Sequence, residues 1–175
     1  MNIYKKVAVA TCLMAGAFQS AYAIPTFTDL ATQANSAGGN INIGSFNHTA
    51  LTNDAFWNKQ GNAKVKFKSE ISGYDNAMGY ANTDGTGATI VLNEGDSGWY
   101  TLNGAPDPFT FFLDTQQGNN WFSDNTLNSD NLDHMLAFQK NDGSNRFLLF
   151  WDDQSGGGDR DFNDFVARVN FVSPS

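Results

Sequence analysis

The segment GGGDRDFNDFVARV, residues 156–169, decides how the C-terminal part of this chain folds. Carboxylates at Asp159, Asp161 and Asp164 follow three glycines, and the segment then continues directly into alternating apolar residues. Glycine and aspartate in this density indicate a turn, and the alternation indicates a strand with one face in a core. The segment therefore predicts an acidic turn that leads directly into a buried strand.

The chain upstream of this turn contains further strand candidates separated by turns. The candidates lie at residues 63–74, 88–95, 99–104, 108–115, 134–140, 146–153 and 164–172. The connecting segments NTDGTG, NGAPDP, QQGNN and KNDGSN are rich in residues that favour turns. Several candidates are continuously apolar, which favours strands buried on both faces or the aromatic-rich interior of a sandwich. We expect an all-β fold, an antiparallel β-sandwich or jelly-roll-like single domain.

Two segments give more detailed expectations. In AKVKFKSEISGY, Val65 and Phe67, and with them Ser69 and Ile71, alternate with charged residues, so these four side chains are expected to face inward. The best helix candidate is FTDLATQANSA, in which we expect Asp29 to be the N-cap.

The first 23 residues have the three parts of a secretory signal peptide. Two lysines precede an apolar run, which ends in the small-x-small sequence Ala21-Tyr22-Ala23. We expect cleavage before Ile24, which gives a secreted domain of residues 24–175 in the extracellular space or the periplasm. The apolar run is shorter than the roughly 20 residues that span a bilayer, so we expect no membrane span in the mature chain.

The charge balance limits the possible partners. The chain has 10 Lys and Arg against 18 Asp and Glu, a net charge of −8. Loss of Lys5 and Lys6 with the signal peptide leaves eight basic residues and a net charge of −10. Nucleic acids and anionic membranes bind basic surfaces, and we expect neither as a partner. The single cysteine, Cys12, lies in the signal peptide, so no disulfide is expected.

The acidic turn is a candidate metal site. In extended backbone, side chains at i, i+2 and i+4 project to the same side, so Asp159, Asp161 and Asn163 are expected to converge. Calcium takes six to eight oxygens at about 2.3–2.6 Å, whereas magnesium usually keeps several waters, so Ca²⁺ is the expected ion. Strand-end carboxylates are expected to complete the set. The expected ligands are Asp152, Asp153, Asp159, Asp161, Asn163 and Asp164.

Three motifs of the C-terminal part form a recognisable pattern. They are a D-H-x-x-x-F strand at Asp133, His134 and Phe138, an apolar strand that ends in an acidic pair, and the turn D-R-D-F-N-D. Residues 108–169, which contain them, resemble the DUF4114 family, a domain of uncharacterised function found in exported bacterial proteins.

The resemblance implies a β-rich, calcium-dependent module and brings no established activity. It also suggests Asp133 as a member of the metal shell, whereas His134 is expected to be a hydrogen-bonded structural residue. Many exported relatives continue into a PEP-CTERM sorting tail. This chain ends at SPS, so we expect a freely secreted or periplasmic product.

Adjacent aromatic residues occur three times, as Phe56–Trp57, Trp99–Tyr100 and Trp121–Phe122. Neighbours in a strand point to opposite faces, so we expect one ring of each pair in the core. The alternative is that exposed rings of these pairs stack on sugars.

These features predict a secreted, calcium-stabilised, non-enzymatic binding or structural module that acts in adhesion, extracellular matrix or glycan contact. Its expected partner is an extracellular glycan, or a surface or matrix protein. Two alternatives stay open for the protein, a carbohydrate-active hydrolase that uses the acidic cluster and a purely structural matrix subunit. For the turn itself, the alternative is a solvated acidic loop that serves solubility.

Overall fold

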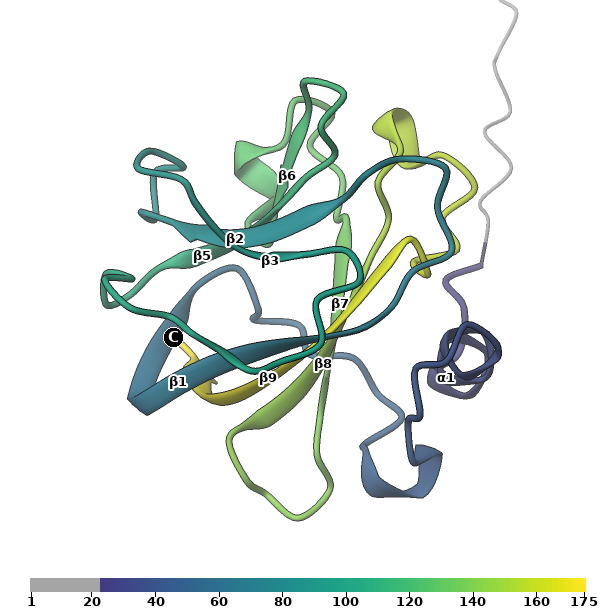
Figure 1. The fold of residues 1–175 in the computed structure, drawn as a ribbon. Coiled ribbons are helices and arrows are strands. Elements are labelled where there is room, and N and C mark those ends of the chain that lie inside the picture. The colour runs from purple at the N-terminus through teal and green to yellow at the C-terminus, as the bar shows by residue number, and fades with distance from the viewer. Residues whose placement is uncertain (1–22) are drawn as a thin grey trace, which may run out of the picture.

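The strands of residues 23–175, the part of the chain that the computed structural model describes, form two antiparallel sheets packed face to face (Figure 1). One sheet has the order β4-β1-β9-β8-β7 and the other β3-β2-β5-β6. The strands are β1 (Trp57–Ser69), β2 (Ala77–Ala81), β3 (Thr89–Asn93), β4 (Tyr100–Thr101), β5 (Thr110–Asp114), β6 (Asn120–Phe122), β7 (Met135–Gln139), β8 (Arg146–Trp151) and β9 (Phe165–Pro174). The predicted all-β sandwich is confirmed, and the predicted signal peptide lies outside the described residues.

The facing sides of the two sheets enclose the main core. Alternate residues of β8, namely Phe147, Leu149 and Trp151, are buried in it. Trp57 of β1 lies edge-on against Phe111 of β5, with ring centroids 5.4 Å apart, and against Phe147, with centroids 5.1 Å apart. Buried aromatic rings remove a large apolar area from water, so these contacts hold the two sheets together.

A second core lies on the outer side of the five-stranded sheet. Leu148 and Phe150 of β8 and Val166 of β9 are buried there against helix α1 (Phe27–Ser36) and the segment that follows it. Figure 1 shows α1 outside the sheet, beside the two sheets rather than between them. Strand β8 therefore has a buried apolar side chain at nearly every position, as its continuous apolar sequence predicts.

Helix α1 is capped by Thr26. Its Oγ1 accepts a hydrogen bond from the Asp29 backbone N–H at 3.2 Å and donates one to Asp29 Oδ2 at 2.6 Å. The prediction of Asp29 as N-cap is therefore wrong. Asp29 is the third residue of the helix, from which its carboxylate bonds back to the cap in a reciprocal pair.

Two details of the strand predictions differ from the structure. Ile71 follows the end of β1 and is 42 % exposed, whereas Val65 and Ser69 are buried. Strand β2, buried at all five positions, was not predicted. Its short sequence is interrupted by Gly79, where a Cβ atom would lie 2.0 Å from the Thr89 carbonyl oxygen. The close approach of β3 therefore requires glycine and breaks the alternating pattern.

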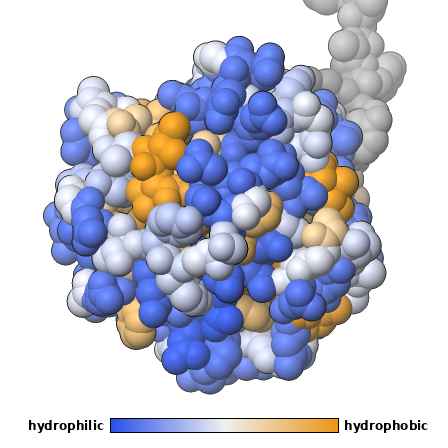
Figure 2. All heavy atoms as spheres, in the orientation of Figure 1, coloured by the Kyte–Doolittle hydropathy of each residue, from blue (hydrophilic) through white to orange (hydrophobic). Residues whose placement is uncertain are grey.

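The aromatic pairs behave in two ways. Trp57 and Trp121 are buried, as predicted for one ring of each pair. Trp99 and Tyr100 are both exposed, by 39 % and 36 %, because β4 is a two-residue edge strand whose neighbour in the sheet is β1. The prediction of one buried ring is wrong for this pair. Figure 2 shows that hydrophobic residues form small separate patches on an otherwise hydrophilic face.

Candidate metal site

Three carboxylates meet where β8 ends and β9 begins. Asp152 and Asp153 follow β8, and Asp164 precedes β9, the neighbouring strand. One oxygen of each carboxylate lies within 4.8 Å of one oxygen of the other two, and all three residues are buried. Two calcium ligands on opposite sides of an ion lie about 4.6–5.2 Å apart, so this spacing fits one ion. We call Asp152, Asp153 and Asp164 the acidic triad.

Hydrogen bonds hold the triad in place. The backbone N–H of Asp153 donates to Asp164 Oδ2 at 2.9 Å, and that of Gln154 donates to Asp152 Oδ1 at 3.0 Å. Asp153 Oδ2 accepts from Asn76 Nδ2 at 2.9 Å and from the Ser72 hydroxyl. Within residues 23–175, the side-chain hydrogen bonds of the triad thus go to one oxygen of each carboxylate.

Two stacked rings support the backbone of the triad. His134 is fully buried and stacks on Trp121, with ring centroids 3.9 Å apart and planes at 9°. His134 Nδ1 lies 3.0 Å from the Asp152 carbonyl oxygen, and its Nε2 lies 3.1 Å from Asp130 Oδ2. Trp121 Nε1 donates to the Asp153 carbonyl oxygen at 2.8 Å. His134 is thus a hydrogen-bonded structural residue, as expected from the sequence.

The turn between the triad residues is not extended. Arg160 and Phe162 both have a φ of 53°, in the left-handed region, so the expectation that alternate side chains project to one side does not apply here. Phe162 is buried in the second core. Gly156, at a φ of 73°, donates its N–H to Asp130 Oδ2 at 2.8 Å, which ties the turn to the segment before β7.

The six predicted ligands fall into two groups. The structure gathers the triad, and it places Asp159, Asp161 and Asn163 on the adjoining turn. Asp159 is exposed, whereas Asp161 is half-buried and accepts from Asn163 Nδ2 at 2.7 Å. Asn163 Oδ1 is buried and accepts no hydrogen bond. An amide oxygen of this kind is a suitable additional ligand for a cation.

The electrostatics of the triad favour protonation or a bound cation. Burial raises the pKa of Asp152 to about 6. Burial, together with repulsion from Asp153 and Asp161, raises the pKa of Asp164 well above its usual range. Among residues 23–175, no lysine or arginine lies within 4.0 Å of the triad to form an ion pair. Buried like charges without a counterion are costly, and a metal ion removes this cost.

Two contributors from the connection between β1 and β2 were not predicted. Asn76 is 1 % exposed, and its Oδ1 is buried without a hydrogen-bond partner beside Asp153. Both carboxylate oxygens of Glu70 are also buried and unpartnered. Burial, then repulsion from Glu94 and Asp153, raises the pKa of Glu70. Unpartnered buried oxygens are rare in proteins and are expected where an ion or water binds.

The only sequence signal for Glu70 is its residue type. Glu70 and Glu94 are the two glutamates of the chain, and the fold brings them within reach of each other. The position of Glu70 among the charged residues of a half-exposed strand indicated solvent contact instead. Contacts between distant strands cannot be read from this local pattern.

A second carboxylate pair lies outside the triad. Asp54 is buried, and burial together with repulsion from Asp133 raises its pKa to about 7. Asp133 Oδ1 accepts from the Met135 backbone N–H at 3.0 Å. Asp133, suggested as part of the metal shell by family resemblance, thus caps the start of β7 and is not one of the triad residues.

The fold and the site define this chain as a β-sandwich protein with a buried carboxylate cluster that could hold a metal ion. Comparison with known families matches residues 83–172 to the family described as "Domain of unknown function (DUF4114)". The match covers half of the chain and includes the whole triad, so the chain belongs to the DUF4114 family. It begins upstream of residue 108, where the sequence resemblance was expected to start.

The other comparisons add no relative. Searches of curated proteins and of solved structures found no match. Within residues 23–175, no helix is long and apolar enough to cross a membrane.

Proposed function

We propose that this protein is an exported, calcium-stabilised binding module without enzymatic activity. The observation that carries the calcium assignment is the acidic triad, three buried carboxylates with ligand oxygens within 4.8 Å and no basic partner within ion-pair distance in the described chain. The donor set consists of hard oxygens, which calcium prefers. Transition metals are disfavoured, because residues 23–175 contain no cysteine and both ring nitrogens of His134 have other partners.

The ion would stabilise the fold by joining three segments. Asp152 and Asp153 would tie the end of β8 to Asp164 at the start of β9. Asn76, which contacts Asp153, would add the connection between β1 and β2 and thereby the opposite sheet. Calcium at 100 times its dissociation constant would add about 2.7 kcal/mol to the free energy of unfolding. In a chain with no cysteine beyond residue 12, such an ion replaces a disulfide.

Thermal unfolding of the purified protein in calcium, in magnesium and in excess EDTA tests this proposal. We expect calcium to raise the midpoint by about 5–10 °C and magnesium to raise it less. Asp152→Asn should abolish the rise, whereas Asp84→Asn, at an exposed turn position, should keep it. Asp161→Asn and Asn163→Ala measure whether the adjoining turn contributes ligands. An unfolding midpoint of the unmodified protein that does not change with calcium would exclude the calcium site.

Export and a binding role are the second part of the proposal. The first 23 residues support export, because they have the parts of a signal peptide. The mass of the protein recovered from a bacterial periplasm or culture medium tests it: a chain that begins at Ile24 is expected, and an uncleaved chain would contradict it. Exposed aromatic residues such as Trp99 and Tyr100 support contact with an extracellular glycan or a surface protein.

A carbohydrate-active hydrolase is the second candidate. Carboxyl groups with raised pKa values, such as Asp152 and Asp164, also occur in acid–base catalysis. This candidate predicts release of reducing sugar from a polysaccharide, and loss of that release in Asp164→Asn. Binding of a polysaccharide without any cleavage supports the non-enzymatic module instead.

A further inference from the structure

The outer side of the five-stranded sheet has two different halves. One half is the apolar second core, which α1 covers. The other half carries basic side chains at positions that alternate with main-core residues of the same strands. These basic residues, which we call the basic face, are Lys64, Lys66, Lys68, Arg146 and Arg168.

Like charges are concentrated on the basic face. It holds five of the eight lysines and arginines that follow residue 23, in a chain with 18 acidic residues. Lys66 lies directly opposite Arg168 in the register of β1 and β9. Within residues 23–175, no carboxylate lies within 4.0 Å of a basic-face nitrogen. Like charges directly opposite each other destabilise a sheet, so this arrangement calls for a functional reason.

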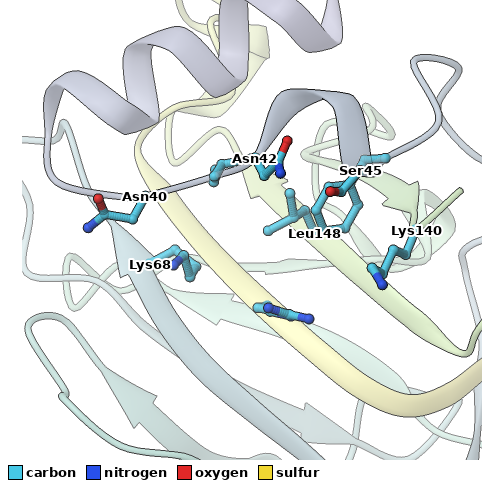
Figure 3. Close-up of a pocket in the computed structure, with 9 residues that line it drawn as sticks. Asn40, Asn42, Ser45, Lys68, Lys140 and Leu148 are labelled. Carbon is cyan, nitrogen blue, oxygen red and sulfur yellow. The ribbon is translucent and has the colours of Figure 1, made fainter. Parts of the chain in front are cut away.

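A pocket of about 130 Å³ lies at the border between the two halves. In Figure 3, Lys68 and Lys140 lie on opposite sides of it, and the segment with Asn42 and Ser45 lies above them. Arg168 also lines the pocket, and its Nε is buried without a hydrogen-bond partner. The full lining is Asn40, Ile41, Asn42, Ser45, Phe46, Lys68, Lys140, Leu148 and Arg168.

The electrostatics of the pocket fit an anion. Burial, then repulsion from Lys66 and Arg168, lowers the pKa of Lys68. Burial and repulsion from Arg146 also lower the pKa of Arg168, although Asp142 opposes this shift. Asp142 forms an ion pair with Lys140 at the far side of the pocket. The positive charge of Lys68 and Arg168 is therefore left for a ligand.

An exposed aromatic ring extends this surface. Lys64 Nζ lies 5.0 Å from the centroid of the Trp99 ring, and Arg168 Cζ lies 5.8 Å from it. Arg168 thus contacts both the pocket and Trp99. Phe171, also exposed, lies 5.7 Å from Lys64 Nζ. A flat exposed ring beside cations offers a stacking surface next to an anion site.

We infer that the basic face binds an acidic polysaccharide, with a carboxylate or sulfate group in the pocket between Lys68 and Arg168 and a neighbouring sugar ring stacked on Trp99. The pocket, with a volume of about 130 Å³, has room for one anionic group. Asn42 and Ser45 offer hydrogen bonds to hydroxyl groups.

The polyanion of this proposal is a glycan rather than a nucleic acid. The chain as a whole is acidic, with a net charge of −8, whereas domains that bind nucleic acid are typically basic overall. The basic face is short, since Lys64 to Lys68 span about 13 Å at 3.3 Å per residue. The inference rests on the proposed binding role of the protein and is independent of the calcium site.

Binding of the full protein to defined polymers tests the inference. The probes are alginate, which carries carboxylates, dextran sulfate, which carries sulfate esters, neutral dextran and single-stranded DNA, each measured by calorimetry at low and at physiological ionic strength. The variants are Arg168→Gln, Lys68→Gln and Trp99→Ala. Lys59→Gln is the matched control, because Lys59 lies on β1 opposite the core residue Val172 and outside the basic face.

We expect salt-sensitive binding of alginate or dextran sulfate and no binding of neutral dextran, and the tighter of the two identifies the anionic group. Arg168→Gln should weaken binding by about tenfold or more, and Trp99→Ala by about threefold to tenfold. Lys59→Gln should change it less than about twofold. Equal binding by Arg168→Gln, tighter binding of DNA, or no binding of either acidic polymer would overturn the inference. The calcium-dependent midpoint of the same preparations separates these outcomes from a failure of the calcium site.

Discussion

The acidic triad and the basic face both gather like charges, but they differ in burial. Asp152, Asp153 and Asp164 are buried, whereas Lys66 and Arg168 are partly exposed to solvent. A buried carboxylate cannot be screened by salt or water, so its charge requires a proton or a metal ion inside the protein. A partly exposed cation is screened, so the basic face can exist without a ligand and still attract one. The same crowding therefore indicates a structural ion in one region and an exchangeable ligand in the other.

The largest expected effect is the dependence of calcium-free stability on pH. Burial raises the pKa of Asp54 to about 7 and that of Asp152 to about 6 in the folded protein, against about 3.9 in an unfolded chain. Between these values the folded state binds more protons than the unfolded state, so the free energy of unfolding falls as pH rises. In EDTA we expect stability to be highest near pH 4 and to fall by several kcal/mol towards pH 7, at about 1.36 kcal/mol for each unit of pKa difference.

Urea unfolding at a series of pH values measures this slope. Asp54→Asn, which lies outside the triad, should flatten the slope near pH 7 and leave the calcium response intact. Calcium should have the opposite pH dependence, because it binds the ionised triad, so its stabilising effect should grow as pH rises. A calcium-free protein that gains stability from pH 4 to pH 7 would contradict the buried, unneutralised carboxylates.

The effect of Asp164→Asn on stability should have opposite signs in EDTA and in calcium. In EDTA the amide removes one buried carboxylate that faces Asp153, and we expect this variant to unfold at a higher temperature than the unmodified protein. In calcium it loses a ligand and should be less stable than the unmodified protein by about 2.7 kcal/mol, the stabilisation from an ion at 100 times its dissociation constant. Calorimetric scans of both proteins in both conditions reveal the crossing. A variant that is less stable in EDTA as well would show that Asp164 acts mainly through its hydrogen bond from the Asp153 N–H.

The sequence could predict half of the metal site, because this half follows from local strand patterns. Asp152, Asp153 and Asp164 flank two apolar strands whose patterns are unambiguous, so pairing of β8 with β9 brings them together. Asn76 comes from the connection between β1 and β2, and its contact with Asp153 joins residues 77 positions apart. No local pattern marks such a contact. The left-handed backbone at Arg160 also could not be predicted, because it is set by the packing of the turn.

The basic face could not be predicted from the sequence either, because it also depends on contacts between distant residues. The lysines of β1 have the sequence pattern of an ordinary solvated strand face. In the sequence, Arg146 and Arg168 are isolated cations within apolar strands. The register of β1, β9 and β8 brings these lysines and arginines together on one surface. The exposure of Trp99 was also missed, because it depends on β4 being a short edge strand.

Removal of Arg168 should stabilise the protein modestly. Its Nε is buried without a partner, and Lys66 and Arg146 repel its charge. Arg168→Met keeps the aliphatic packing and removes both costs, so we expect a gain of about 1 kcal/mol, the lower end of the cost of an unpartnered buried group, or about 2–4 °C in midpoint. Thermal scans in EDTA and in calcium should show the same gain. A loss of stability would mean that contacts of the Arg168 guanidinium, such as the one with the Trp99 ring, outweigh both costs.

The smallest expected effect comes from placing an acid on the basic face. Lys66→Glu sets a carboxylate directly opposite Arg168 in the register of β1 and β9, and opposite charges at such positions stabilise a sheet by about 0.2–1 kcal/mol. We expect a gain within this range at low salt and a smaller gain at high salt, because the pair is partly exposed and therefore screened.

The same change should abolish binding of acidic polysaccharide, since the new carboxylate occupies the anion site of Arg168. Lys59→Glu, outside the basic face, should change neither property. If the variant is stabilised and still binds the polysaccharide, the ligand does not bind at Arg168. If it loses both stability and binding, the like charges of this face are less costly than their spacing indicates.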